Sequence, residues 1–105
     1  MGQYINLTKD NFDSEIKEGV TMVDFWAEWC GPCRALAPVI DELANDFENK
    51  AKICKVNIDN ENEIAAKYGI KSIPTILFFK DGQLYDTKTG ADTKDFFTKK
   101  INEKL

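Results

Sequence analysis

The chain has 105 residues, 43% of them hydrophobic, and a formal net charge of −4 at pH 7. This length and hydrophobic content predict one domain over residues 1–105 and exclude a disordered chain. The acidic balance argues against nucleic acid or an anionic lipid surface as a partner, because both require clustered Lys and Arg. The N-terminus does not resemble a secretory signal, and no apolar run has the length of a membrane span. We therefore expect a cytoplasmic monomer with no membrane partner.

The first half of the chain predicts helices and strands in alternation. The spacing of apolar residues from Thr8 to Gly19 indicates a short first helix, with the Thr8 hydroxyl as its N-cap. A near-continuous apolar run over 20–27 is typical of a strand that is buried on both faces of a sheet. Apolar residues at helical spacing then run from Cys33 to Phe47 and predict a second helix.

The second half predicts three strands and two helices, and the last two strands form a hairpin. The strands are expected over 51–59, 73–80 and 84–89, and the helices over 62–68 and 93–105. Asp81-Gly82 separates the last two strands and is a strong signal for a tight turn between antiparallel neighbours. Helices between the early strands and a late hairpin predict an α/β fold, with a central mixed β-sheet flanked by helices on both faces.

Cys30 and Cys33 are separated by two residues, at the point where the strand over 20–27 gives way to a helix. A structural zinc site needs four Cys or His ligands, but the chain offers only Cys54 in addition and no histidine, so we expect no metal. A purely structural disulfide would close so short a loop that it stabilises folding by only about 2 kcal/mol. The remaining interpretation is a redox pair of the C-x-x-C type.

Each residue of this motif suits a redox cycle. Cys30 lies at a helix start, where unpaired N–H groups favour a thiolate, so we expect an exposed nucleophile. Cys33, about one turn further on, should be screened by the helix and should attack the mixed disulfide in the second step. Gly31 permits close backbone approach, and Pro32 presets φ for the first helical turn. Neither residue adds a charge that stabilises the thiolate, so we expect a reducing pair.

Six sequence features follow one another along the chain: DFWAEWCGPC, Pro38, KVNID, YGIKSIPT, KDGQ and TGA. In this order and spacing they resemble the thioredoxin family of bacterial type over essentially the whole chain. The resemblance implies the thioredoxin fold and a thiol-disulfide oxidoreductase that reduces disulfides in client proteins. It implies no bound metal or organic cofactor. It also implies that a flavin-containing thioredoxin reductase returns the cysteine pair to the dithiol.

The resemblance assigns roles to two charged residues of the predicted strands. It implies that Asp24 is buried behind Cys33 and helps to move the Cys33 proton, and that Lys55 lies near Asp24 and tunes it. Burial would raise the pKa of Asp24, which would let it hold or accept a proton near neutral pH. From the residues alone, an aspartate and a lysine on solvated strand faces remain open alternatives.

The resemblance also implies a surface that contacts the client. Trp29 would offer a flat amphipathic ring beside the disulfide. A cis Pro74 would abut the cysteines and leave the backbone of Ile73 free to pair with an extended client segment, although the base rate for X-Pro bonds favours a trans bond. Gly90 and Ala91 would form the floor of the docking groove, and their alternative role is a turn before the last helix.

Three positions depart from the commoner family pattern and affect partner preference: Arg34, Ser72 and Thr89. Cys54 has apolar neighbours and is expected to be a small core residue. Two functional alternatives remain, a docking module that acts without redox turnover and a disulfide oxidant or isomerase. The variant Cys33→Ser separates the first alternative from a reductase, because only a redox protein would trap mixed disulfides.

Overall fold

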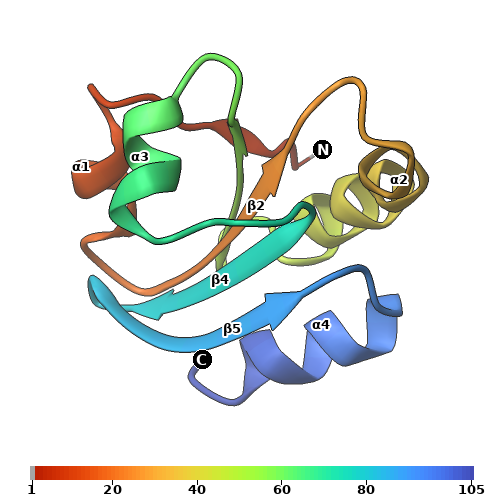
Figure 1. Cartoon of the computed structure of the whole chain (residues 1–105). Helices are drawn as coiled ribbons and strands as arrows, with labels where there is room; N and C mark the ends of the chain where they lie inside the picture. Colours follow the sequence, from red (N-terminus) through yellow and green to blue (C-terminus); the bar gives the residue numbers. More distant parts are fainter. Residues whose placement is uncertain (1) are drawn as a thin grey trace.

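The structure is a computed structural model of the chain and describes residues 2–105. It contains a five-stranded sheet with helices on both faces (Figure 1). The strands are β1 (Ile5–Asn6), β2 (Val20–Trp26), β3 (Lys52–Asn57), β4 (Thr75–Lys80) and β5 (Gln83–Thr89). The helices are α1 (Phe12–Ile16), α2 (Gly31–Asp46), α3 (Asn62–Lys67) and α4 (Lys94–Asn102). Within residues 2–105, no helix combines the length and the apolar character that crossing a membrane requires.

The sheet is mixed and has the spatial order β1-β3-β2-β4-β5. β1 and β2 each pair with β3 in parallel, whereas β4 runs antiparallel to both β2 and β5. The Asp81-Gly82 turn joins β4 to β5 with φ of 50° and 83°, and a two-residue type I′ hairpin needs positive φ at both positions. The predicted α/β fold, with a mixed sheet flanked by helices, is confirmed.

The central strand β2 contributes to two cores, because successive side chains of a strand point to opposite faces of the sheet. Met22 belongs to the core beneath α2 and α4, together with Ile40 and Phe97. Phe25 belongs to the core beneath α1 and α3, together with Phe12. Figure 1 shows these two helix pairs on opposite sides of the sheet. Coverage of both faces explains the near-continuous apolar run over 20–27.

Two features near the N-terminus differ from the expectation. β1 has no counterpart among the predicted strands, because two residues are too few for a period-two pattern to stand out. α1 begins at Phe12, with Asn11 rather than Thr8 at its N-cap position, and the Thr8 hydroxyl accepts the Asp10 N–H at 3.2 Å in the preceding turn. The Asn11 side chain accepts the Thr8 N–H at 2.7 Å. The predicted Thr8 N-cap is therefore wrong.

Candidate active site

Cys30 and Cys33 lie where α2 begins, shortly after the end of β2. Cys30 is the N-cap residue of α2 and has extended backbone angles, φ −89° and ψ 108°. Its Sγ accepts a hydrogen bond from the Cys33 N–H at 3.2 Å, one of the N–H groups that a helix start leaves without an intrahelical partner. Gly31 and Pro32 occupy the first helical positions, where the missing N–H of proline is not needed. The Cys30 sulfur thus lies at the positive end of a 16-residue helix.

The two cysteines form a disulfide, and their Cα atoms are 5.2 Å apart. Both are covered in this state, since Cys30 is 5% exposed and Cys33 is 3% exposed. They pack with Ala27 in a small apolar cluster. The expected contrast between an exposed Cys30 and a screened Cys33 is therefore not found in the disulfide form. The cysteines differ instead in position, because Cys30 precedes the helix and Cys33 lies within its first turn.

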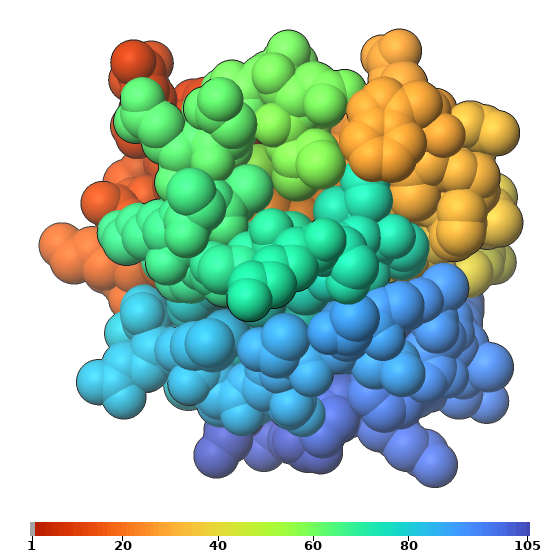
Figure 2. Space-filling model, in the orientation of Figure 1, coloured from red at the N-terminus to blue at the C-terminus, as the bar shows by residue number. Residues whose placement is uncertain are grey.

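Ile73 packs against the disulfide cluster, and Pro74 follows it in the chain. The peptide bond between them is cis, as the family resemblance implies. The Ile73 carbonyl oxygen is 3.8 Å from Cys30 Sγ. β4 begins at Thr75 rather than at Ile73, so the Ile73 backbone takes no part in the sheet. The Gly90 N–H donates to the Pro74 carbonyl at 2.8 Å. Figure 2 shows the orange, turquoise and blue segments around residues 30, 73 and 90 meeting on one face.

Trp29 lies next to Cys30 in the chain and is 67% exposed, which is a large fraction for an aromatic side chain. Its indole Nε1 donates to Asp59 Oδ2 at 3.0 Å. Asp59 is itself held in the turn after β3, where its N–H donates to Asn57 Oδ1 at 2.9 Å. Ala91, which follows Gly90, is also exposed. The disulfide is thus adjacent to an exposed aromatic ring whose orientation is fixed by a carboxylate.

Asp24 is the acidic residue in the buried centre of β2. Strand alternation places it on the same face as Met22, beneath α2, the helix that carries Cys33. It is 1% exposed, and neither carboxylate oxygen has a hydrogen-bond partner among residues 2–105. Burial raises the pKa of Asp24 from 3.8 to about 7, and the charge of Lys55 opposes this rise. Asp24 is therefore able both to hold and to accept a proton at neutral pH.

Lys55 lies opposite Asp24 in the register of β2 and β3 and is 6% exposed. Its ammonium nitrogen is 4.3 Å from the centroid of the Trp26 ring and 4.8 Å from that of the Tyr4 ring. Aromatic faces carry partial negative charge and attract such a cation. Asp24 and Lys55 are both buried, so the alternative of solvated strand faces is wrong for both.

Three residues near these groups did not stand out in the sequence: Tyr4, Trp26 and Asp59. Trp26 packs against the disulfide cluster as well as Lys55, and its buried Nε1 has no partner within the described chain. Strand alternation offered a signal for Trp26, since residues 24 and 26 point to the same face. Tyr4 precedes a two-residue strand and Asp59 lies in a turn, and only the assembled sheet brings them to the site.

Cys54 lies on the other face of the sheet, within the core beneath α1 and α3, and is fully buried. Burial raises the pKa of its thiol to about 12, so it stays protonated at neutral pH. The expectation of a core residue is confirmed.

The three positions that depart from the family pattern lie close to the disulfide in the chain or in space. Arg34 donates to the Glu28 carbonyl at 2.8 Å, which braces the turn that precedes the disulfide. The Ser72 carbonyl accepts the Thr75 hydroxyl at 2.6 Å, just before the cis bond. Thr89 ends β5 next to Gly90.

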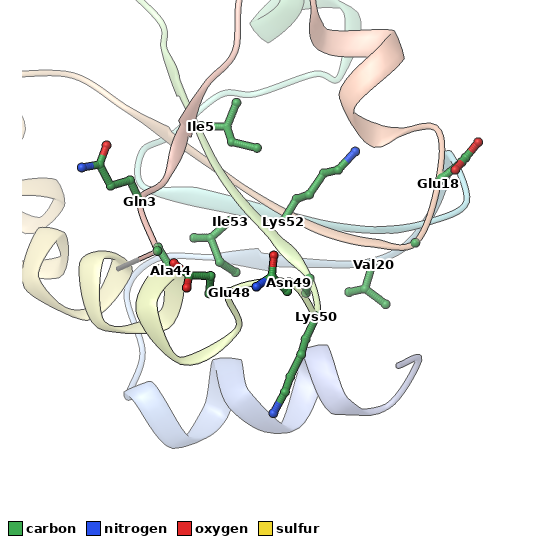
Figure 3. A pocket seen from close by; sticks show the side chains of 13 residues that line it. Gln3, Ile5, Glu18, Val20, Ala44, Glu48, Asn49, Lys50, Lys52 and Ile53 are labelled. Carbon is green, nitrogen blue, oxygen red and sulfur yellow. The ribbon is translucent and has the colours of Figure 1, made fainter.

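A cavity of about 460 Å³ lies at the other end of the sheet (Figure 3). Its walls include Gly19 and Ala51, which precede β2 and β3, and Ala44 near the end of α2. The cysteines follow the end of β2, so this cavity is remote from the disulfide. Among residues 2–105, no three Cys, Asp or Glu side chains gather closely enough to hold a metal ion.

A disulfide at the start of a helix, beside a cis-proline loop and with a buried acid on the sheet face that the same helix covers, defines the protein as a thiol-disulfide oxidoreductase. The thioredoxin family model matches residues 3–103. The chain belongs to the thioredoxin family.

Individual relatives agree with this assignment. The chain is 48% identical over 106 aligned positions to thioredoxin of Chlorobaculum thiosulfatiphilum, covering 99% of this chain and 98% of that one. It is 46% identical over 101 positions to thioredoxin of Staphylococcus aureus (strain Mu50), covering 96% and 97%. The crystal structure of Malassezia sympodialis thioredoxin (Mala s 13) matches with a TM-score of 0.86 at 34% identity, covering 99% and 92% of the two chains.

The fold is therefore the thioredoxin fold, and the protein is a protein-disulfide reductase that cycles between a Cys30-Cys33 dithiol and disulfide. The predicted family, fold and activity are confirmed. Membership of the family implies thioredoxin reductase and disulfide-containing client proteins as partners.

Proposed function

We propose that Cys30 attacks the client disulfide, that Cys33 resolves the mixed disulfide, and that Asp24 accepts the Cys33 proton. The observation that carries this assignment is the buried carboxylate of Asp24. It has no hydrogen-bond partner within the described chain, its pKa is raised to about 7, and it lies on the sheet face beneath the helix that holds Cys33.

In the first step, Cys30 acts as the nucleophile. The N–H groups at the start of α2 favour its thiolate, as the Cys33 N–H at 3.2 Å from Cys30 Sγ illustrates. The thiolate attacks one sulfur of the client disulfide. A bond forms between Cys30 and that sulfur, the client S–S bond breaks, and the other client sulfur leaves as a thiolate and takes a proton from water.

In the second step, Cys33 gives its proton to the Asp24 carboxylate and attacks Cys30 Sγ as a thiolate. The Cys30-Cys33 bond forms while the mixed disulfide breaks. The released client thiolate is protonated, with Asp24 as the proton donor. The client gains two electrons and two protons, and the cysteine pair is oxidised. Thioredoxin reductase then has to supply two electrons to restore the dithiol.

The client segment is proposed to lie across the surface beside the disulfide, which consists of Trp29, Ile73, Pro74, Gly90 and Ala91. Support comes from the Ile73 backbone, which is outside the sheet and whose carbonyl oxygen is 3.8 Å from Cys30 Sγ. An extended client chain can pair with such a backbone by strand addition. The exposed Trp29 ring adds contact area.

The first test of the cysteine roles is Cys33→Ser. This variant should still attack a client disulfide through Cys30 but should not release the product, so covalent mixed disulfides should accumulate and disappear on addition of dithiothreitol. The matched control is the double variant Cys30→Ser/Cys33→Ser, which should form no mixed disulfide with a client. A docking module without redox turnover would bind clients equally well with both variants and form no covalent product.

The test of the Asp24 role is Asp24→Asn, studied by rapid mixing with a client disulfide. The first step should keep its rate, whereas resolution by Cys33 should slow and lose its dependence on a group that titrates near pH 7. Resolution at the wild-type rate at every pH would remove Asp24 from the mechanism.

We further propose that residues 1–105 act as one monomeric domain in the cytoplasm and use neither nucleic acid nor a membrane as a partner. The net charge of −4 supports the absence of both anionic partners. The match of one family model to residues 3–103 supports a single domain. Light scattering of the purified protein at physiological salt tests the oligomeric state, and a dimer mass would contradict it.

A further inference from the structure

We propose that Tyr4 is a positioning residue of the redox site, which holds the Lys55 ammonium against Trp26 and so keeps its positive charge beside Asp24. This inference rests on the proposed role of Asp24 as the acceptor of the Cys33 proton. Tyr4 itself contacts none of the reacting atoms and acts through Lys55.

The pairing of β1 with β3 places the Tyr4 ring. Ile5 lies opposite Cys54 and Asn6 opposite Lys55, and the Leu7 N–H donates to the Lys55 carbonyl at 2.8 Å. Ile5 packs with the core beneath α1 and α3. Because strand side chains alternate, Tyr4 turns to the other face of the sheet, which is the face of Asp24. The short strand that the sequence did not reveal therefore delivers an aromatic ring to the buried lysine.

Two aromatic rings hold the Lys55 ammonium. A lysine that is only 6% exposed normally needs a paired charge. Within residues 2–105, Lys55 forms no ion pair with a carboxylate at 4 Å or less. Its nitrogen lies instead 4.3 Å from the Trp26 ring centroid and 4.8 Å from that of Tyr4. Since Trp26 is fixed by its packing on the disulfide cluster, the half-exposed Tyr4 is the ring that closes the cage from the solvent side.

Few other charges can affect Asp24. β3 contributes Lys55, β4 pairs Asp24 with an apolar residue, and α2 contributes Cys33. On the solvent side, the exposed Asp41 of α2 lines an open hollow together with Tyr4. Lys55 is the charge that lowers the pKa of Asp24 against the effect of burial. Holding Lys55 in place therefore keeps more of the Asp24 carboxylate ionised and ready to accept a proton at neutral pH.

The test follows the Asp24 carboxyl carbon by NMR during a pH titration of the oxidised protein. Tyr4→Leu keeps the apolar cover but removes the π face, so Lys55 is held less firmly. The titration midpoint of Asp24 should then move to higher pH by about half a unit, a size that the loss of one ring contact can supply. Tyr4→Phe retains the ring and should leave the midpoint unchanged. An unchanged midpoint in Tyr4→Leu would overturn the proposal.

A double-mutant cycle identifies the route of the effect. Lys55→Met removes the charge and should itself move the Asp24 midpoint to higher pH, and Tyr4→Leu should add nothing in that background. If Tyr4→Leu raises the midpoint by the same amount with and without Lys55, the effect does not pass through the lysine, and the proposal is wrong. Asp41→Asn is the control for the neighbouring carboxylate, and a shift to higher pH as large as that of Tyr4→Leu would assign the placement of Lys55 to Asp41 instead.

The two proposals fail in different ways. The NMR midpoint reports the coupling of Tyr4, Lys55 and Asp24 in the oxidised protein and needs no turnover. The role of Asp24 in turnover is tested by the resolution rate of Asp24→Asn. A normal rate in that variant, together with the expected midpoint shift in Tyr4→Leu, would leave the placement of Lys55 intact and remove only the catalytic role of Asp24.

Discussion

The two faces of the central sheet each bury an ionisable group, with different consequences. Asp24 and Cys54 lie on neighbouring strands one register step apart, since Val23 pairs with Cys54 and Asp24 with Lys55. Both groups are almost completely buried. Burial raises the pKa of Asp24 from 3.8 to about 7 and the pKa of Cys54 from 9.0 to about 12. The same physical effect therefore brings the pKa of Asp24 to neutral pH and moves the pKa of Cys54 out of the physiological range.

The residues that surround Asp24 and Cys54 also differ. Asp24 shares its face with Lys55 and lies beneath the helix of the cysteine pair, whereas Cys54 is surrounded by the apolar core beneath α1 and α3. Desolvation alone therefore does not create an acid-base group that works at neutral pH. It does so only where the pKa of the group in water is low enough for burial to bring it near 7, and where a second ionisable group lies close enough to exchange a proton.

The largest expected effect distinguishes the thiols on the two faces. Cys30→Ser should abolish reduction of a protein disulfide, because the one cysteine left in the motif cannot complete the dithiol-disulfide cycle. Cys54→Ala should leave the rate unchanged, since the buried thiol stays protonated. Reduction of insulin coupled to thioredoxin reductase and NADPH measures both variants. A large loss of rate in Cys54→Ala would break the contrast between the faces.

A second prediction concerns stability and pH. The Asp24 carboxyl titrates near 3.8 in the unfolded chain and near 7 in the folded protein, so the folded state binds more protons between these values. The free energy of unfolding should therefore fall as the pH rises from about 4 to about 7, by about 4 kcal/mol in all. Asp24→Asn should remove this part of the slope. Urea unfolding from pH 4 to pH 8 measures both proteins, and equal slopes would contradict the burial of an unpaired carboxylate.

A smaller effect should come from polarity in the apolar core. Cys54→Ser places a hydroxyl among apolar side chains and should lower the free energy of unfolding by about 1–3 kcal/mol. Its activity should remain intact at temperatures where the fold persists. Thermal unfolding compares it with Cys54→Ala, which controls for the lost sulfur. Equal stability of the two variants would show that the Cys54 pocket tolerates polar groups.

The smallest effect is expected outside both cores. The hydrogen bond from the Trp29 indole to Asp59 lies on the exposed surface. Asp59→Ala removes its acceptor, so the Trp29 ring should lose its fixed orientation. The KM for a protein client should rise about two- to fivefold, which corresponds to a typical net hydrogen bond of about 0.5–1 kcal/mol. The kcat should change little. A change in kcat with constant KM would place Asp59 in the chemical steps instead.

Much of this architecture could be predicted from local patterns. The run over 20–27 indicated a strand covered on both faces, and Asp81-Gly82 indicated the hairpin. One missed feature depends on contact between distant segments, because β1 is visible only as a partner of β3. The Thr8 cap failed for a local reason, because the Thr8 hydroxyl accepts the Asp10 N–H in a turn and α1 begins only at Phe12, with Asn11 at its N-cap position.

The candidate site could likewise be predicted only in part from the sequence. The spacing of Cys30 and Cys33 predicted the redox pair, but the residues alone did not decide whether Asp24 and Lys55 were buried. The cis bond before Pro74 followed from the family resemblance and not from its base rate. Tyr4 carried no signal, because its position over Lys55 arises only when β1 joins the sheet.

The central claim is that burial turns Asp24 into an acid-base group at neutral pH on the face that serves the cysteine pair. The most direct measurement is the titration of the Asp24 carboxyl carbon by NMR in the wild-type oxidised protein. The account predicts a midpoint near pH 7. A midpoint close to 4, as for a carboxylate in water, would contradict it.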